Sequence, residues 1–124
     1  MALILIRGIR GIYLSTKHIP VLTEEVVTAL NLKASGTYID CTLGEGGHTL
    51  QILESTDLPI KILGFEIDSK AIQSAKETLR NYRDQVTIVN ASYIDLYRQT
   101  IQLGIMKVEG VVFDLGLSSL QLGG

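Results

Sequence analysis

Glycines and acids recur in this chain where strand-like apolar segments end. The first such point, Asp40–His48, contains Gly44, Gly46 and Gly47. Glycines after a strand let backbone N–H groups approach a ligand closely, and the Gly44-x-Gly46 spacing fits a nucleotide-binding loop. The alternative is that these glycines form a tight turn that binds no ligand. A dinucleotide fingerprint requires a third glycine at position 49, where this chain has Thr49, so the spacing argues against NAD.

Carboxylates follow the second and fourth apolar segments. Glu66 lies about 20 residues beyond the glycine loop, where an acid commonly accepts both ribose hydroxyl hydrogens and repels a 2′-phosphate. Asp68 is expected to cap the next helix rather than bind a ligand. Asp114 follows three apolar residues that should be buried, and a carboxylate there requires hydrogen-bond partners or a ligand. These acids predict a polar pocket beside the glycine loop.

Tyr93 follows the third apolar segment, near the expected position of an adenine ring. Its ring can pack against that adenine, or it can belong to the apolar face of the next helix. The sequence leaves the two alternatives even.

A scaffold of alternating strands and helices must position these residues. Such alternation indicates βαβ units around a parallel sheet, with ligands beyond the carboxyl ends of the strands. The fold class is therefore α/β and Rossmann-like, with about four parallel strands in the order 3-2-1-4. The expected strands are 37–43, 60–66, 86–89 and 108–115, and the expected helices are 22–30, 48–55, 71–82 and 92–103.

Composition excludes several classes of protein. The chain has 124 residues, 46% of them apolar, and a net charge of −2, which excludes a highly charged disordered chain. A single cysteine excludes a disulfide framework and a zinc cluster, so no metal is expected. No apolar run approaches the roughly 20 residues that span a bilayer. Lys17, Arg80, Arg83 and Arg98 are scattered and predict solvated faces rather than a nucleic-acid surface.

Two segments divide the chain. Residues 1–17 carry three basic residues and no acid, and are expected to be a poorly ordered extension, with an organellar presequence as the alternative. Residues 18–124 are expected to hold the folded part. Four strands would leave Val111–Phe113 as an apolar edge strand with no neighbour, which is a pairing hazard.

Three phrases of the sequence resemble the ribosomal RNA small subunit methyltransferase H family, also called MraW. They are His18-Ile19-Pro20-Val21-Leu22 with Glu25-Val26, then Asp40-Cys41-Thr42-Leu43-Gly44-Glu45-Gly46-Gly47-His48-Thr49, and Asp114-Leu115-Gly116-Leu117-Ser118-Ser119-Leu120-Gln121-Leu122.

The resemblance implies a class I methyltransferase core that uses S-adenosyl-L-methionine. It implies methylation of the N4 amine of a cytidine in the decoding region of 16S rRNA, within the small ribosomal subunit. The implied location is the bacterial cytoplasm, with mitochondria as the alternative; no membrane partner is expected, and a homodimer stays open. The implied cofactor contacts are Gly46, Gly47, His48, Glu66, Tyr93, Asp114 and Gln121, and Asp114 is also the candidate catalytic acceptor.

Some positions depart from the family pattern. Asp is usual where Glu66 stands, Phe is frequent at Tyr93, and Pro is usual at Leu120, while Glu45 adds an acid to the glycine loop. The family pattern also continues beyond residue 124, so residues 18–124 are expected to form the N-terminal half of the cofactor-binding domain. The rival hypotheses are a catalytically inactive fragment that binds S-adenosyl-L-methionine, and half of a NAD-dependent oxidoreductase.

Overall fold

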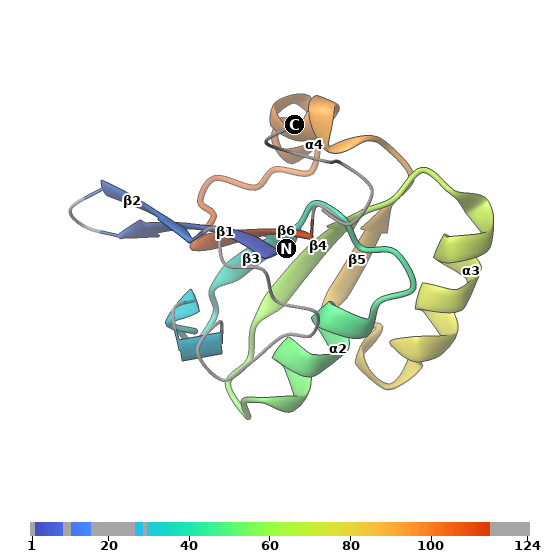
Figure 1. The fold of residues 1–124 in the computed structure, drawn as a ribbon, viewed down its shortest axis with the longest axis horizontal. Helices are drawn as coiled ribbons and strands as arrows, with labels where there is room; N and C mark the ends of the chain where they lie inside the picture. Colours follow the sequence, from blue (N-terminus) through green and yellow to red (C-terminus); the bar gives the residue numbers. More distant parts are fainter. Residues whose placement is uncertain (1, 9–10, 16–26, 29, 115–124) are drawn as a thin grey trace, which may run out of the picture.

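The computed structural model describes residues 2–8, 11–15, 27–28 and 30–114 of the chain. The expected alternation of strands and helices is present, preceded by two further strands (Figure 1). The elements are β1 (Ala2–Gly8), β2 (Gly11–Ser15), β3 (Thr37–Asp40), α2 (Gly47–Glu54), β4 (Lys61–Phe65), α3 (Ser69–Thr78), the 3₁₀-helix η1 (Arg80–Tyr82), β5 (Val86–Val89), the 3₁₀-helix η2 (Tyr93–Asp95), α4 (Leu96–Gln102) and β6 (Gly110–Asp114).

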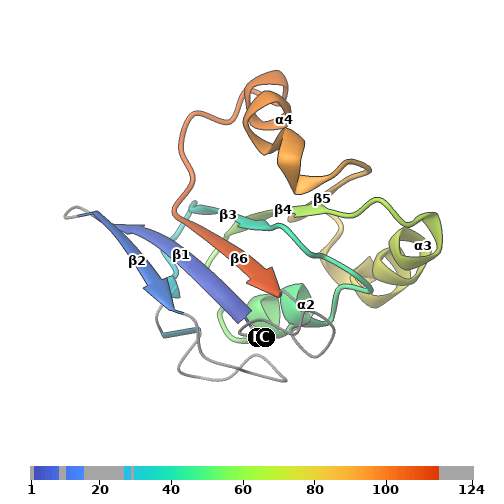
Figure 2. The same ribbon diagram turned by 45° about the horizontal axis from the view of Figure 1, so that its top comes forward.

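The sheet has the strand order β2-β1-β6-β3-β4-β5. Strands β6, β3, β4 and β5 are parallel, with Tyr38 opposite both Gly110 and Ile62. Numbered along the chain, these four strands read 3-2-1-4 from the β5 side, so the predicted order is confirmed. The crossover connections place α2 and α3 on one face of the sheet and α4 on the other (Figure 2).

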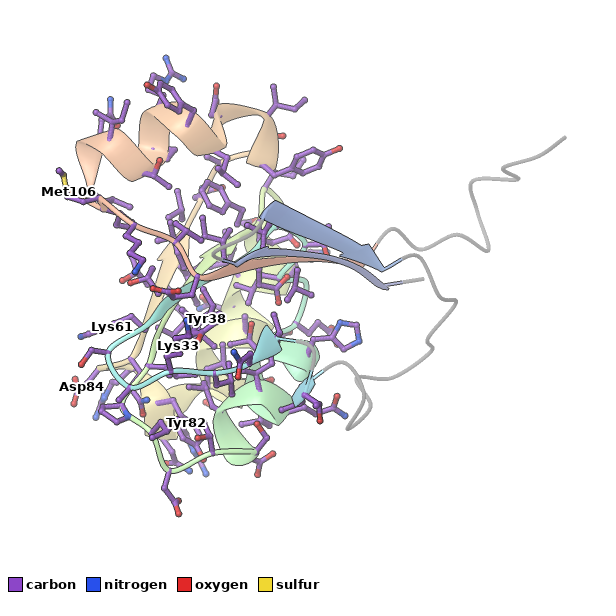
Figure 3. All side chains as sticks on the ribbon, turned by 90° about the vertical axis from the view of Figure 1, so that its left-hand side faces the viewer. Lys33, Tyr38, Lys61, Tyr82, Asp84 and Met106 are labelled. Carbon is purple, nitrogen blue, oxygen red and sulfur yellow. The ribbon has the colours of Figure 1, made fainter. Side chains whose placement is uncertain are left out.

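Both faces of the central strands β3 and β4 are buried, as their apolar sequences predict, whereas β5 at the edge is half-buried to exposed. Neighbouring residues alternate between two core clusters: Tyr38 packs with Ile62 and Leu79 on the side of α2 and α3, and Ile39 packs with Leu63 on the side of α4. The phenol of Tyr38 accepts a hydrogen bond from the backbone N–H of Lys33 at 2.8 Å (Figure 3). The sheet therefore lies between two apolar layers. Polar groups are placed at the ends of its strands.

The N-terminal residues depart from the expectation of a poorly ordered extension. Strand β1 pairs antiparallel with β6, with Leu3 opposite Phe113 and Leu5 opposite Val111, and β2 pairs antiparallel with β1. The predicted unpaired edge at Val111–Phe113 is therefore wrong. An unpaired apolar strand presents a row of backbone donors and acceptors, and the apolar residues of β1, which include Ile4 and Ile6, supply a partner strand.

Other predicted segments lie partly outside the described residues. Of the expected helix 22–30, only residues 27, 28 and 30 are described, and they are helical. Leu30 is buried in the core cluster beside Tyr38. Residues 18–26 and 115–122, which carry two of the three family phrases, are outside the described residues. Within the described part, no helix is long and apolar enough to cross a membrane.

Candidate functional site

The carboxyl ends of the four parallel strands meet at one edge of the sheet, because parallel strands run in the same direction. Asp40 ends β3, Glu66 follows β4, Asn90 follows β5, and Asp114 ends β6. Since β3 lies between β6 and β4 in the sheet, Asp40 is flanked by the ends that carry Asp114 and Glu66. The edge thus collects three acids from strands that are far apart in sequence.

The glycine loop between β3 and α2 depends on backbone conformations that favour glycine. Gly44 has a φ of 57° and Gly46 a φ of 88°, and the Gly46 N–H donates to the Leu43 carbonyl at 2.9 Å. A Cβ atom on Gly46 would lie 3.1 Å from Leu79 Cδ1, so this position needs glycine for both conformation and space. The tight Gly46 turn starts α2 directly beside the strand ends.

Gly47 has the opposite surroundings. It is exposed, and a Cβ atom built on it would meet nothing within 4 Å. The first turn of α2 therefore faces open space at this residue, and its backbone N–H groups have no intrahelical carbonyl partner. His48 follows in the same turn and is half-buried. This end of α2 is sterically able to receive a ligand.

A buried hydrogen bond fixes the loop to the strand. The Asp40 carboxylate is 1% exposed, accepts the Thr42 N–H at 3.0 Å on Oδ1, and accepts the Thr49 hydroxyl at 2.8 Å on Oδ2. Thr49 is fully buried. The side chain at the end of β3 thus holds both the start of the loop and the first turn of α2, and Thr49 has a structural role at the position where a dinucleotide fingerprint requires glycine.

Glu66 connects the loop to the neighbouring strand. Its Oε1 accepts the Gly44 N–H at 2.9 Å, and its Oε2 accepts the N–H groups of Ile67 and Asp68, each at 3.0 Å. A carboxylate offers about four acceptor positions, so these three bonds orient it while leaving it half-buried. A ligand with two hydroxyl donors has to share an acceptor position with one of these backbone groups.

Asp68 has the capping role predicted for it. It is the N-cap of α3, and its carboxylate accepts the Lys70 N–H at 2.9 Å. Capping uses the side chain to satisfy an orphan donor at the start of the helix. Asp68 is therefore part of the helix start, and Glu66 is the acid that faces the glycine loop.

Tyr93 lies in η2, beyond the end of β5. It exposes 43% of its surface, and it is absent from the core cluster to which its neighbours Ala91 and Leu96 contribute. Of the two alternatives for this ring, the structure does not support burial in the apolar face of α4. The ring is accessible on the side of the sheet covered by α4.

Asp114 is described only through its backbone. It is the last residue of β6, opposite Ala2 of β1. Gln121 lies outside the described residues. The structure therefore joins Gly44 to Glu66 and Asp40 to the loop residues beside the glycines, and it puts Asp114 at the same strand edge.

Cys41 lies beside the loop, and its thiol is unreactive at neutral pH. Burial, and to a lesser extent the charge of Asp40, raise the pKa of its thiol to about 12. A thiol with that pKa is protonated at neutral pH and is not a nucleophile. Its backbone N–H donates to the Val112 carbonyl at 2.8 Å, which extends the pairing of β3 with β6. Within the described residues no three metal-binding side chains gather.

Sequence reasoning missed two contacts of this site, the hydroxyl of Thr49 on Asp40 and the Gly44 N–H on Glu66. Thr49 carried a usable signal, since it is a polar residue in the first turn of a helix that follows a buried acid. The second contact depends on strand spacing and had no local signal.

Comparison with known proteins places the chain in a family. The model of the MraW methylase family matches residues 15–124. Ribosomal RNA small subunit methyltransferase H of Clostridium botulinum strain Hall is 45% identical over 107 residues, which cover 86% of this chain and 34% of that protein. The chain thus spans about a third of the length of the curated relatives it matches.

Solved structures share the fold. A SAM-dependent methyltransferase from Thiobacillus denitrificans, in complex with S-adenosyl-L-homocysteine, matches with a TM-score of 0.50 and 22% identity, covering 62% of this chain and 32% of that chain. An rRNA methylase from Streptococcus thermophilus matches with a TM-score of 0.50 and 19% identity, covering 67% and 50%. The family match confirms the resemblance seen in the sequence: the chain belongs to the MraW methylase family.

Proposed function

We propose that the glycine loop and Glu66 bind S-adenosyl-L-methionine, and that the protein methylates RNA of the small ribosomal subunit. The observation that carries the proposal is the 2.9 Å hydrogen bond between the Gly44 N–H and Glu66 Oε1. It joins the two elements that bind nucleosides in Rossmann-like folds, the loop after the first parallel strand and the acid after the second. Family membership and the name of the Clostridium relatives support the same activity.

The residues at the edge fit an adenosine ligand. Glu66 is half-buried and oriented by backbone donors, which suits a carboxylate that accepts ribose hydroxyls. Gly47 leaves open space at the start of α2, Gly46 forms the tight turn before it, and Tyr93, which exposes 43% of its surface, is proposed to pack against adenine. By their match to the family motif, His48, Asp114 and Gln121 complete the proposed contact set. We further propose that residues 18–124 form the N-terminal half of the cofactor-binding domain.

The chain's own residues hold the nucleoside half of the cofactor, orient the attacking amine and accept its proton. When bound, the cofactor supplies an electrophilic methyl group on a sulfonium. The loop and Glu66 hold its nucleoside half in place, so that proximity contributes to the rate. Asp114 accepts a hydrogen bond from the attacking amine, orients its delocalised lone pair and takes up its proton.

The specific substrate is the N4 amine of a cytidine in the decoding region of 16S rRNA. Such a base must be single-stranded or flipped out of its stack to reach a pocket at the sheet edge. Because the matched relatives are bacterial proteins named for the ribosomal small subunit, we assign the protein to the cytoplasm rather than to mitochondria. Whether the protein forms a homodimer is decided by measuring its mass in solution.

A second candidate function is cofactor binding without transfer, which the contact between the glycine loop and Glu66 would by itself support. To separate the two, the chain is incubated with methyl-labelled cofactor and unmethylated small subunits, and the rRNA is digested to nucleosides. Labelled N4-methylcytidine supports transfer, whereas cofactor binding with no labelled nucleoside supports the second candidate. An Asp114→Asn variant that methylates at the normal rate would refute the role of Asp114.

A further inference from the structure

A basic hollow lies at the edge of the sheet formed by β5. It has a volume of about 380 Å³ and opens between the end of α3, η1 and β5, on the side of the molecule where α3 lies in Figure 1. Strand β5 ends the strand order, so the described sheet does not continue beyond the hollow. Its lining residues are Lys76, Leu79, Arg80, Arg83, Val86 and Ile88.

Three of the six lining residues are cations, in a chain whose net charge is −2. Lys76 lies in the last turn of α3, Arg80 begins η1 and Arg83 follows η1, so the turn that ends α3 brings the three cations to one hollow. Arg80 pairs with Glu77 at 2.8 Å, but both side chains are largely exposed. Neither Lys76 nor Arg83 has an ion pair among the described residues. The lining holds no acid, and Glu77 beside it pairs with only one of the three cations, so the hollow carries net positive charge.

Nearby acids and bases do not reverse this balance. Asp84 follows Arg83 and is exposed. Its backbone carbonyl accepts a hydrogen bond from the Lys61 ammonium at 3.2 Å (Figure 3). Lys61 therefore adds a fourth cation close to the start of β5. Elsewhere, Arg98 is paired with Asp95 at 3.2 Å on the α4 side of the molecule. Arg80 and Arg83, which the sequence predicted to be scattered, are thus gathered with Lys76 at one place.

The floor of the hollow is aliphatic. Leu79 is buried, and Val86 and Ile88 are half-buried. Cations around an aliphatic floor are complementary to a chain that presents regularly spaced anions with an uncharged body between them. A nucleic-acid backbone has this composition, with phosphates that bind Lys and Arg and sugars that contact apolar surface.

We propose that this hollow binds the phosphate backbone of the RNA substrate, through cations that are not among the proposed cofactor contacts. The inference rests on the proposed function for the identity of the RNA. The hollow lies between α3 and the outermost described strand, and its cations are outside the glycine loop, although Leu79 of its floor packs beside Gly46. It therefore contributes to RNA affinity and position and has no part in the chemistry of the reacting base.

The test compares the double variant Lys76→Gln/Arg83→Gln with the control Arg98→Gln, an exposed arginine outside the hollow. Binding of protein-free 16S rRNA is measured across a series of KCl concentrations. The inference predicts that the double variant binds roughly tenfold more weakly and lowers the salt slope by about 1.4–1.8, since each lost phosphate contact removes about 0.7–0.9. The control should match the wild type, and thermal unfolding verifies that all three proteins are folded.

Three outcomes would overturn the inference: a double variant with unchanged slope and affinity, an equal loss in the Arg98→Gln control, or a defect on intact subunits that is absent on protein-free rRNA. The last outcome would indicate an acidic protein partner. Methyl transfer is measured separately, and the double variant should raise KM for RNA with unchanged kcat. If the wild type transfers the methyl group and the double variant binds RNA as the wild type does, the role of the hollow is refuted and the proposed function stands. If the double variant weakens RNA binding but the wild type neither binds the cofactor nor transfers a methyl group, the proposed function is refuted and the role of the hollow stands.

Discussion

The hydrogen bond between Thr49 and Asp40 yields the sharpest prediction about the site. Thr49→Val replaces the hydroxyl by a methyl group of similar size, so it removes the 2.8 Å bond to Asp40 Oδ2 and preserves the packing. Thr49→Ser does the reverse, because it keeps the hydroxyl and removes a methyl group from a fully buried position. The two variants therefore separate hydrogen bonding from packing at a single residue.

The expected magnitudes follow from burial. Removing a hydrogen bond from a buried carboxylate costs about 1.5–3 kcal/mol of unfolding free energy, because the oxygen cannot exchange its partner for bulk water. Loss of one buried methyl group costs about 0.5–1.5 kcal/mol. We expect Thr49→Val to lower the midpoint of thermal unfolding by roughly 6–12 °C and Thr49→Ser by about half as much or less.

The same bond affects ligand binding, because Asp40 also holds the Thr42 N–H at the start of the loop. We expect Thr49→Val to weaken binding of S-adenosyl-L-methionine by about tenfold, which corresponds to 1.4 kcal/mol, and Thr49→Ser to bind nearly as the wild type. Thermal unfolding and calorimetric titration give the two quantities. The reasoning is refuted if Thr49→Ser is the more damaging variant, or if Thr49→Val is as stable as the wild type.

Three further predictions concern the loop, the thiol and the N-terminal strands. Gly46→Ala should lower the unfolding free energy by about 1–3 kcal/mol, because its φ is 88° and Leu79 lies 3.1 Å from the new Cβ atom, whereas Gly47→Ala should change it little; urea unfolding measures both, and equal losses would contradict this account. Because the folded pKa of Cys41 is about 12 and the ordinary value is 9.0, the unfolded chain loses its proton first as pH rises. Stability should therefore fall above about pH 9, by at most about 1.4 kcal/mol per pH unit for this group, and a Cys41→Ala variant should show a shallower fall. Deleting residues 1–15 removes the partner of β6 and should promote self-association, measured by size-exclusion chromatography with light scattering; a deletion variant that stays monomeric and equally stable would show that the pairing contributes nothing.

The central fold could be predicted because its signals are local. Runs such as Ile62–Phe65 are apolar on both faces, and capping residues such as Asp68 mark where helices begin. Both features are set by residues within a few positions of each other. The acid after the second strand was also predictable, since Glu66 stands at a fixed distance from the glycine loop.

The remaining features depend on contacts between distant residues. The β1–β6 pairing joins the start of the chain to Val111 and its neighbours, and apolar strand-forming residues alone do not specify a partner. Thr49 was predictable as a departure from a dinucleotide fingerprint but not as the donor to Asp40. The hollow beside β5 requires Arg83 and Lys76 to face the same strand, which their spacing along the chain does not show.

We infer that Glu66 and the glycine loop act as one cofactor-binding unit. Calorimetric titration of S-adenosyl-L-methionine into the wild type and the Glu66→Gln variant tests it most directly, with Glu45→Gln as the control because Glu45 is an exposed acid in the same loop. An amide at position 66 puts an N–H donor where the carboxylate now accepts backbone N–H groups. We expect saturable binding by the wild type and Glu45→Gln, and an affinity for the cofactor that is about tenfold or more lower in Glu66→Gln. Equal affinities in all three proteins, or no binding by the wild type, would contradict it.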